Sequence, residues 1–278
     1  MAKIDLHVHS NISDGSDSVD DLLRKIFETG IKIFALTDHD TVAGLKLMRD
    51  ILPDGVQFIP AIELTCEAGG IECHILGYNC DYNNKNLLAL IEKGKLLRRN
   101  KLEKRIQYLE DNWNIVLTKE ERDWLYSRKS VVKTHLANVL VKRGLASDNI
   151  SAMKKYLDSC KTEASKFNTQ EAINTLLLAG AIPVWAHPLG GEGEVHISEE
   201  KFLQQLDVMK MYGIKGLECY YSRYNTDEIS FLVNCAKKHN LLISGGSDYH
   251  GTNKDIPLGK LNVENNFVDS SLLTVLGI

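Results

Sequence analysis

The sequence predicts an α/β fold with a parallel sheet or barrel, interrupted by a helical insertion. Strand-like segments alternate with amphipathic helices up to about residue 83 and again from about residue 167. Between residues 84 and 166 the charge is dense, the apolar spacing is helical, and no strand signal is clear. We therefore expect a barrel built from 1–83 and 167–278, with a small helical domain inserted at 84–166.

Four strands and two helices are expected before the insertion. The first helix is capped by Ser16 or Ser18 and stops at Gly30, and a Gly69-Gly70 turn joins the third and fourth strands. The strands are the opening segment that ends at His9, IKIFALTDHD (31–40), VQFIPAIELTCE (56–67) and IECHILGYN (71–79), and the helices are SDSVDDLLRKIFETG (16–30) and TVAGLKLMRDI (41–51).

After the insertion, three more strands alternate with helices, which makes seven strands in all. The strands are AIPVWAHP (181–188), IKGLECYY (214–221) and LLISGGSDYH (241–250). The helices are TQEAINTLLLAG (169–180), SEEKFLQQLDVMKMYG (198–213), TDEISFLVNCAKKHN (226–240) and a last one at SSLLTVLGI (270–278).

Composition narrows the classes of function. A net charge of −4 argues against an extended nucleic-acid surface, and no apolar run is long enough to span a membrane. The N-terminus lacks an apolar signal segment, and the six cysteines show no C-x-x-C pair, which is typical of reduced thiols. We expect a cytoplasmic protein, and the sequence does not indicate its oligomeric state.

Each predicted strand carries a histidine or an acidic residue at or near one end. Because the carboxyl ends of barrel strands meet on one face, these side chains should converge there. Imidazoles mixed with carboxylates suit Zn²⁺, Mn²⁺ or Fe²⁺, and the set is large enough for two or three ions with Glu63 as a bridge. The residues are His7, His9, Asp38, His39, Glu63, His74, His187, Glu218, Asp248 and His250.

The ordered set of motifs resembles the PHP (polymerase and histidinol phosphatase) family from end to end. The motifs are H-x-H at 7–9, Asp14, T-D-H-D at 37–40, Glu63, His74, A-H-P at 186–188 and S-D-x-H at 247–250. The segments RRNKLEK (98–104), THLANVLVKRG (134–144) and GLECYYSRYNTDE (216–228) resemble its stand-alone bacterial branch, which dephosphorylates nucleotides. The resemblance implies a distorted (β/α)7 TIM-like barrel whose helical insertion covers the active site.

The resemblance also implies a trinuclear metal centre. The first metal would take His7, His9, Glu63 and Asp248, the second would share Glu63 and add His74 and His187, and the third would take Asp14, His39 and His250. In other branches a histidine replaces Asp14, so the metal preference of the third site stays open. Around these ligands, Asp38 and Asp40 would orient ligands or cap the next helix, and Glu218 would hold a histidine or simply end a strand.

Such a centre predicts hydrolysis of a phosphoester by a metal-bound hydroxide, because the ions outweigh the carboxylates and attract phosphate. The candidates for the general acid are His196, Tyr224 and water on the third metal. Substrate contacts are expected from Arg99, Asn100, Lys133, His135, Ser222 and Arg223. Lys133 stands where many relatives have arginine, and Leu189–Gly193 replaces an arginine of some relatives, so the substrate is less certain than the centre.

We expect a phosphomonoesterase of small nucleotides, either AMP-like or 3′,5′-bisphosphorylated. Two alternatives remain open. One is a phosphodiesterase or 5′-to-3′ exonuclease acting on short RNA, which the same centre allows. The other is a non-catalytic metal-binding module. The loop GGEGEVH (190–196) is either a lid or a long connection.

Overall fold

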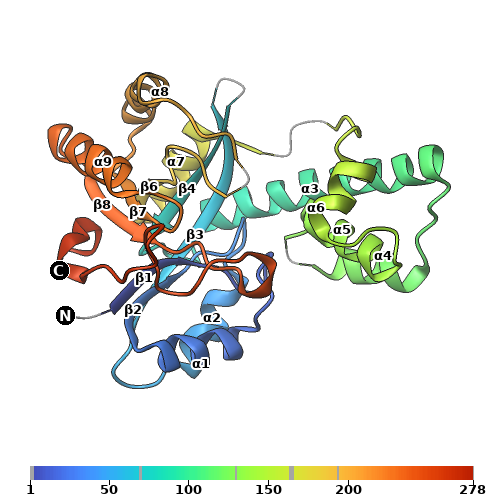
Figure 1. Cartoon of the computed structure of the whole chain (residues 1–278), viewed down its shortest axis with the longest axis horizontal. Helices are drawn as coiled ribbons and strands as arrows, with labels where there is room; N and C mark the ends of the chain where they lie inside the picture. The colour runs from blue at the N-terminus through green and yellow to red at the C-terminus, as the bar shows by residue number, and fades with distance from the viewer. Residues whose placement is uncertain (1–2, 69–70, 129, 163–165, 193, 278) are drawn as a thin grey trace.

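The computed structural model describes residues 3–68, 71–128, 130–162, 166–192 and 194–277 (Figure 1). Its centre is one sheet in which seven strands follow the order β1-β2-β3-β4-β6-β7-β8, while the two-residue β5 pairs with β3. The strands are β1 (Lys3–Val8), β2 (Ile31–Leu36), β3 (Gln57–Ala68), β4 (Ile71–Tyr78), β5 (Phe167–Asn168), β6 (Ile182–Ala186), β7 (Gly216–Tyr221) and β8 (Leu242–Gly246).

Helices surround this sheet (Figure 1). The first one shows how the local sequence sets the bounds: the Ser18 side chain accepts the Asp21 N–H, and Gly30 ends the helix at a φ of 76°. Ser18, not Ser16, is therefore the cap. The helices around the barrel are α1 (Val19–Thr29), α2 (Ala43–Ile51), α7 (Thr169–Leu178), α8 (Glu199–Tyr212) and α9 (Thr226–Lys238).

The first strand and the segment after the last strand bring the two edges of the sheet together. The His9 N–H donates to the Tyr249 carbonyl (2.9 Å), and the Asp248 N–H donates to the His7 carbonyl (2.8 Å). Glycine is required at position 246, because a Cβ there would lie 2.1 Å from the His7 Cβ. The predicted distorted barrel is confirmed as a nearly closed barrel of seven strands.

The expected parallel arrangement does not extend to β4, which pairs antiparallel with both β3 and β6. His74 therefore reaches the carboxyl face of the other strands from the first half of its own strand. Glu63 lies in the middle of β3 instead of near its end, since β3 continues past the barrel edge as a hairpin with β4. Both side chains still arrive on the expected face.

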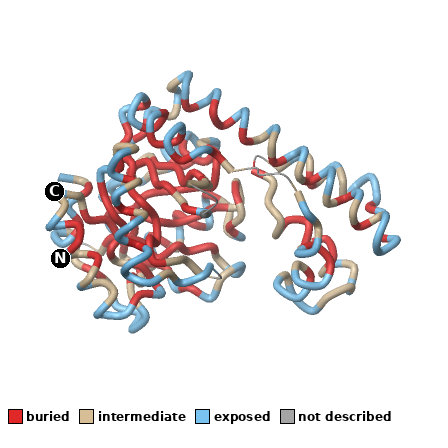
Figure 2. Tube along the Cα trace, turned by 90° about the horizontal axis from the view of Figure 1, so that it is seen from above, coloured by how far each residue is buried: buried red, intermediate tan, exposed pale blue. Residues whose placement is uncertain are grey.

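The helical segment between β4 and β5 has its own hydrophobic cluster, distinct from the barrel core (Figure 2). Leu87 and Leu90, on the first half of α3, belong to the barrel core, whereas Leu102 and Ile106, on its second half, belong to the other cluster. The exact bounds of an inserted domain stay a prediction. The elements are α3 (Lys85–Trp113), α4 (Lys119–Ser127), α5 (Lys133–Lys142), α6 (Asn149–Ala152) and a π-helical turn (Met153–Leu157).

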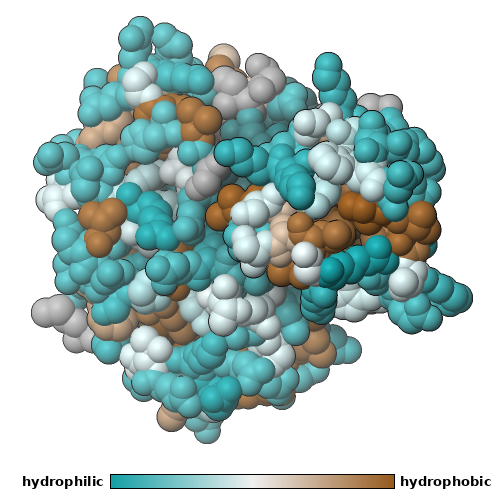
Figure 3. All heavy atoms as spheres, turned by 45° about the vertical axis from the view of Figure 1, so that its right-hand side comes forward, coloured by the Kyte–Doolittle hydropathy of each residue, from teal (hydrophilic) through white to brown (hydrophobic). Residues whose placement is uncertain are grey.

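The surface of the molecule differs between these two parts. In Figure 3 hydrophobic residues form a band across the visible face of the helical segment, while the visible barrel face is largely hydrophilic. Within the described ranges, no helix combines the length and apolarity that crossing a membrane requires.

The expected last helix is not formed. The chain makes two short 3₁₀ turns there, Ser270–Leu272 and Thr274–Leu276. The Asp269 side chain accepts the Ser271 N–H, and the Thr274 hydroxyl accepts the Ile243 N–H of β8 (2.9 Å). These side-chain bonds compete with helix formation and attach the C-terminus to the barrel.

Candidate metal centre

His7 lies in β1 and His9 directly follows it. Their side chains lie on the same side of the chain, as the alternation of side chains along a strand predicts. Both are completely buried, and their ring centroids are 5.2 Å apart. Burying two imidazoles costs free energy unless other polar groups or ions interact with their ring nitrogens.

Glu63 is the group that meets them. Its two carboxylate oxygens lie within 3.3 Å of five different imidazoles, so this single side chain connects all five. The Oε2 atom faces His7 Nε2 (3.2 Å), His9 Nε2 (3.1 Å) and His39 Nδ1 (3.2 Å), and the Oε1 atom faces His74 Nδ1 (3.0 Å) and His187 Nε2 (3.3 Å).

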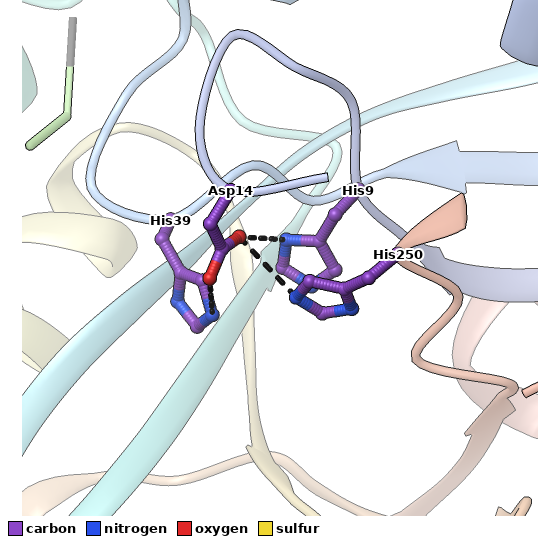
Figure 4. A group of neighbouring side chains, drawn as sticks. All are labelled: His9, Asp14, His39 and His250. Carbon is purple, nitrogen blue, oxygen red and sulfur yellow. Dashed lines mark ion pairs between the residues drawn. The ribbon is translucent and has the colours of Figure 1, made fainter. Parts of the chain in front are cut away.

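A second cluster adjoins the first around Asp14 (Figure 4). The Asp14 Oδ1 atom lies 3.2 Å from His250 Nε2 and 3.7 Å from His9 Nδ1, and its Oδ2 atom lies 3.8 Å from His39 Nε2. His9 and His39 thus face Asp14 with one ring nitrogen and Glu63 with the other. The two clusters therefore have His9 and His39 in common.

Asp248 presents only one oxygen to the centre. Its Oδ1 atom lies 3.4 Å from His9 Nε2, while its Oδ2 atom accepts bonds from Lys254 Nζ (2.7 Å) and the Tyr221 hydroxyl (3.1 Å). The ammonium group of Lys254 and nearby imidazoles such as that of His7 hold the pKa of the carboxyl well below its ordinary value against the effect of burial. Asp248 therefore directs its Oδ1 atom at the imidazoles of the centre, while Lys254 and Tyr221 hold its Oδ2 atom.

Three residues that follow strand ends adopt left-handed backbone conformations: Asp40 (φ 52°), His187 (φ 28°) and Asp248 (φ 60°). Such conformations cost free energy in residues other than glycine and persist only where the surroundings impose them. All three lie on the same face of the barrel, which indicates that the fold tolerates local backbone strain there in order to orient these side chains.

Glu218 lies where the sequence predicted a carboxylate that holds a histidine. Its Oε1 atom lies 2.9 Å from His7 Nδ1, and its Oε2 atom accepts the His187 N–H (2.8 Å). Asp5 was missed by the sequence analysis. It accepts the Ser247 N–H and hydroxyl and the His7 N–H, and burial raises its pKa to about 6.

Asp38 and Asp40 do not cap the next helix, and both bond to groups next to candidate ligands instead. Asp38 accepts the Ser10 N–H (2.8 Å) and the Ser13 hydroxyl (2.7 Å), so it shapes the loop that carries Asp14. Asp40 accepts the Thr65 N–H (2.8 Å) and pairs with Arg98 of α3. Neither caps α2, whose N-terminal cap makes no side-chain bond.

The nine candidate ligands fit divalent ions. Buried polar atoms normally have hydrogen-bond partners, yet within the described part of the chain several atoms here have none and face one another. Those atoms are His7 Nε2, both nitrogens of His9, His39 Nδ1, Glu63 Oε2, His74 Nδ1 and His250 Nε2. The candidate ligands are His7, His9, Asp14, His39, Glu63, His74, His187, Asp248 and His250.

Geometry groups these side chains into sets whose ligand atoms lie within 4.8 Å of one another. One set is His7, His9, Glu63 and Asp248, as expected for a first metal. The others are His9, Asp14, His39 and His250; His39, Glu63 and His74; and His74, His187 and Glu194. Glu194 was not predicted, and nothing in the sequence separates it from its neighbour Glu192.

The electrostatics of the centre favour cations. Burial disfavours protonated His9, but contacts with Asp248 and Glu63 outweigh it and raise the His9 pKa to about 9. Burial opposes ionisation of Glu63 as well, yet the surrounding imidazoles hold the pKa of this carboxyl well below its ordinary value. Ions bound here would take the place of protons.

Of the basic residues predicted to contact substrate, Lys133 lies beside the centre. It lines a cavity of about 370 Å³ together with Asp14, His39 and His74. Arg99 and Asn100 are exposed on α3 and do not line this cavity. Their buried neighbour Arg98 lines it instead.

The remaining predicted contacts are spread around the centre. His135 is buried, accepts the Val132 N–H with its Nδ1 atom, and lines a smaller cavity that also reaches Asp14. Ser222 is buried, and Arg223 pairs with Glu192 and the Asp255 carbonyl.

Both candidate general acids have other partners. His196 is more than half exposed and pairs with Glu228 at the start of α9 (2.7 Å). Tyr224 is buried, its hydroxyl accepts the Leu189 N–H (2.7 Å), and burial raises its pKa well above the ordinary value. A group with that pKa holds its proton firmly.

A model of the PHP domain family matches residues 5–172 of the chain. The match contains the H-x-H pair, Asp14, His39, Glu63 and His74, which meet at one face of the barrel. The chain belongs to the PHP family. It is a PHP-type metal-dependent phosphoesterase.

This PHP protein is 31% identical over 265 residues to a 5′-3′ exoribonuclease of Haemophilus influenzae, with 93% of each chain covered. It is 26% identical over 257 residues to a 3′,5′-nucleoside bisphosphate phosphatase of Chromobacterium violaceum, which covers 90% of this chain and 88% of the relative. The names of these two relatives describe different phosphoester bonds.

The fold is shared with a solved structure from Bifidobacterium adolescentis, provisionally named a metal-dependent phosphoesterase. The TM-score is 0.84 at 24% identity, with 98% of this chain and 94% of the other covered. This likeness supports the barrel architecture from end to end.

Proposed function

We propose that this PHP protein removes a phosphate from a small nucleotide, either AMP-like or a 3′,5′-bisphosphorylated nucleoside. The nine candidate ligands would hold two or three divalent ions, and their mixture of imidazole and carboxylate suits Mn²⁺, Fe²⁺ or Zn²⁺. Such ions supply Lewis acidity toward the phosphate and water activated as a nucleophile at neutral pH.

The observation that carries the proposal is the composition of the 370 Å³ cavity. Its lining combines Asp14, His39 and His74 of the centre with a group of basic residues, and it also includes Glu72. A cationic wall next to a metal centre suits a substrate with a second anionic group besides the phosphate that is removed. The basic residues are Arg98, Lys101, Arg105, Lys133 and Lys166.

The protein's own groups then orient the reacting parts. Glu218 contacts the ring of His7 and accepts the backbone N–H of His187. Asp248 accepts hydrogen bonds from Lys254 and Tyr221. Because these supports use one side of each candidate ligand, the other side is left facing the other candidate ligands. Preorganised ligands of this kind need no rearrangement during the reaction.

A 5′-to-3′ exonuclease acting on short RNA is the second candidate. It is favoured by the Haemophilus influenzae relative and by a second cavity, of about 500 Å³, on the other side of His74. This cavity includes His187 and Lys201 and shares Glu72 and His74 with the first. A dinucleotide whose linking phosphate lay at the centre would extend into both cavities.

Product analysis on protein loaded with Mn²⁺ tests the proposal. The substrates are AMP, 3′,5′-bisphosphoadenosine and a 5′-phosphorylated RNA dinucleotide of two adenosines. The inactive variant is His187→Asn, because asparagine tolerates the positive φ at this position. The matched control is His239→Asn, which replaces a partly exposed histidine directly after α9, outside the candidate ligand set.

Phosphate release from a mononucleotide that is lost in His187→Asn and kept in His239→Asn would support the phosphomonoesterase. Mononucleotides formed from the dinucleotide faster than phosphate is released would replace it with the exonuclease. Metal binding without turnover of any of these substrates would overturn both and favour a non-catalytic metal-binding module.

A further inference from the structure

The loop between β6 and α8 is tied down over the metal centre. The Leu189 N–H donates to the Tyr224 hydroxyl (2.7 Å), and the Ile197 N–H donates back to the Leu189 carbonyl (2.9 Å). Between these ties, the Glu192 N–H donates to the Tyr221 hydroxyl (2.9 Å). The sequence leaves two alternatives for this segment, a lid or a long connection, and in either case these bonds hold the described residues of the loop over the centre.

The loop approaches His187 more closely than a residue with a side chain would allow. A Cβ added to Gly191 would lie 2.8 Å from His187 Nδ1, so the backbone itself packs against the imidazole. The Gly191 N–H donates to Glu194 Oε2 (2.7 Å), and this bond turns the Glu194 carboxylate back toward the centre.

Glu194 meets the far nitrogen of His187. Its Oε2 atom lies 3.3 Å from His187 Nδ1, while His187 Nε2 lies 3.3 Å from Glu63 Oε1. The imidazole is therefore placed between a carboxylate of the centre and a carboxylate of the loop. The Glu194 side chain is about one third exposed, so it lies at the edge of the centre.

We propose that Glu194 is a positioning residue that accepts the Nδ1–H of His187 and so keeps Nε2 free to bind a metal. Histidines that bind metals commonly donate their other N–H to a carboxylate, which fixes the tautomer and the ring orientation. Glu218 and His7 form such a pair elsewhere in this centre, with 2.9 Å between their atoms. The proposal rests on the proposed metal centre and adds the loop to it.

The pairing gives the loop a role in the assembly of the centre. With His187 held by Glu194, the second metal position that the family resemblance implies, at Glu63, His74 and His187, depends on the contact between His187 and the loop. A carboxylate at 194 also adds negative charge beside His74, whose Nδ1 lies 4.0 Å from Glu194 Oε1. This edge of the centre is thereby less attractive to anions than the basic wall across the cavity.

Three variants separate the roles of Glu194. Glu194→Ala removes the acceptor, Glu194→Gln keeps a neutral oxygen that can accept the same N–H, and Glu192→Ala removes the neighbouring acid, which pairs with Arg223. Titration of metal-free protein with Mn²⁺, followed by calorimetry, measures the affinity of each class of site. Nitrogen-15 chemical shifts of His187 in the Zn²⁺-loaded protein report its tautomer.

We expect Glu194→Ala to weaken one class of site by about 10- to 100-fold, as loss of a supporting carboxylate does in other metal sites. Glu194→Gln should recover most of that affinity, Glu192→Ala should leave it unchanged, and wild-type His187 should carry its proton on Nδ1. The variant should fold, because residue 194 lies at the surface of a loop.

Unchanged affinity in Glu194→Ala, or a proton on Nε2, would overturn the proposal. Equal losses in Glu194→Gln and Glu194→Ala would show that the charge binds metal directly, which also overturns a positioning role. These readouts need no turnover, so failure to hydrolyse nucleotides would count against the proposed function and not against this inference.

Discussion

The barrel and the helical segment face each other across one cavity, but they contribute to it in different ways. The barrel wall presents Asp14, His39 and His74, held by strands and by loops with strained backbone. The helical wall presents lysines and arginines, and Lys133, for example, reaches the cavity from the first turn of α5 while pairing with Asp158.

The difference follows from what each kind of contact demands. Metal ligands must meet within fractions of an ångström, which requires a rigid sheet. Electrostatic attraction of an anion falls off slowly with distance, so a cation on a helix is sufficient. We therefore expect changes in the barrel to abolish activity and changes in the helical segment to attenuate it.

Glu63→Gln should have the largest effect. The amide keeps the shape but loses the charge that faces five imidazoles, so metal binding and activity should both collapse. We expect phosphate release to fall by about 10³-fold, which corresponds to the several kcal/mol that metal ions supply in such reactions. Metal content by mass spectrometry and turnover on the best substrate measure this.

The matched control is Glu67→Gln on the same strand, outside the candidate ligand set. It should retain both metal and turnover. Full activity in Glu63→Gln would contradict the barrel's role as the site of chemistry.

Arg98→Met tests the link between the two regions. Arg98 is buried on α3, pairs with Asp40 after β2, and donates to the Thr65 hydroxyl of β3 (3.1 Å). Removing one member of a buried ion pair leaves the other charge uncompensated, so we expect a loss of about 3 kcal/mol in the free energy of unfolding. Urea denaturation measures it.

Arg99→Met, one position along the same helix, changes an exposed residue and should cost no more than about 0.5 kcal/mol. Equal effects of the two substitutions would show that the Arg98–Asp40 pair does not join the regions.

Lys133→Ala should have the smallest effect of the three. Loss of one cation from the helical wall weakens binding of the anionic substrate, and we expect KM to rise about tenfold with kcat within about twofold. Lys142→Ala, at the other end of α5 and over the Trp124 ring, is the matched control. A drop in kcat with unchanged KM would place Lys133 in the reaction itself.

Most of the fold was predictable because strand and helix periodicities differ, but the direction of β4 was missed. The missing signal was the short sequence Gly69-Gly70 between the two predicted strands, although these two residues lie outside the described part of the chain. A parallel connection needs a dozen or more residues, whereas so short a turn permits only an antiparallel hairpin. The hydrophobic alternation of a strand is the same in both directions, so the turn alone could decide.

Arg98 could also have been found from the sequence. It lies four residues after Gly94 and four before Leu102, on the buried stripe of α3, whereas Arg99 lies off that stripe. The family resemblance drew attention to Arg99 and Asn100, and helical periodicity would have corrected it.

Other parts of the centre could not be predicted from sequence. Asp5 reads as an ordinary strand residue, and its bonds to Ser247 and Gly259 exist only because distant segments meet. Glu192 and Glu194 are equivalent in a glycine-rich loop until the fold places one against Arg223 and the other against His187. The candidate ligands and Glu218 were predictable, while Asp5 and Glu194 acquire their partners only through tertiary structure.

The joining of β1 to the end of β8 has a consequence for biosynthesis. Asp5 and Ser247, which are hydrogen-bonded across that seam, are 242 positions apart in the chain. Because β1 is synthesised before β8, it must wait for all the intervening strands and helices before its second neighbour exists. His7 and His9 cannot meet Asp248 until residue 248 has been synthesised, so the candidate ligand set that these three form with Glu63 is among the last parts of the barrel to assemble.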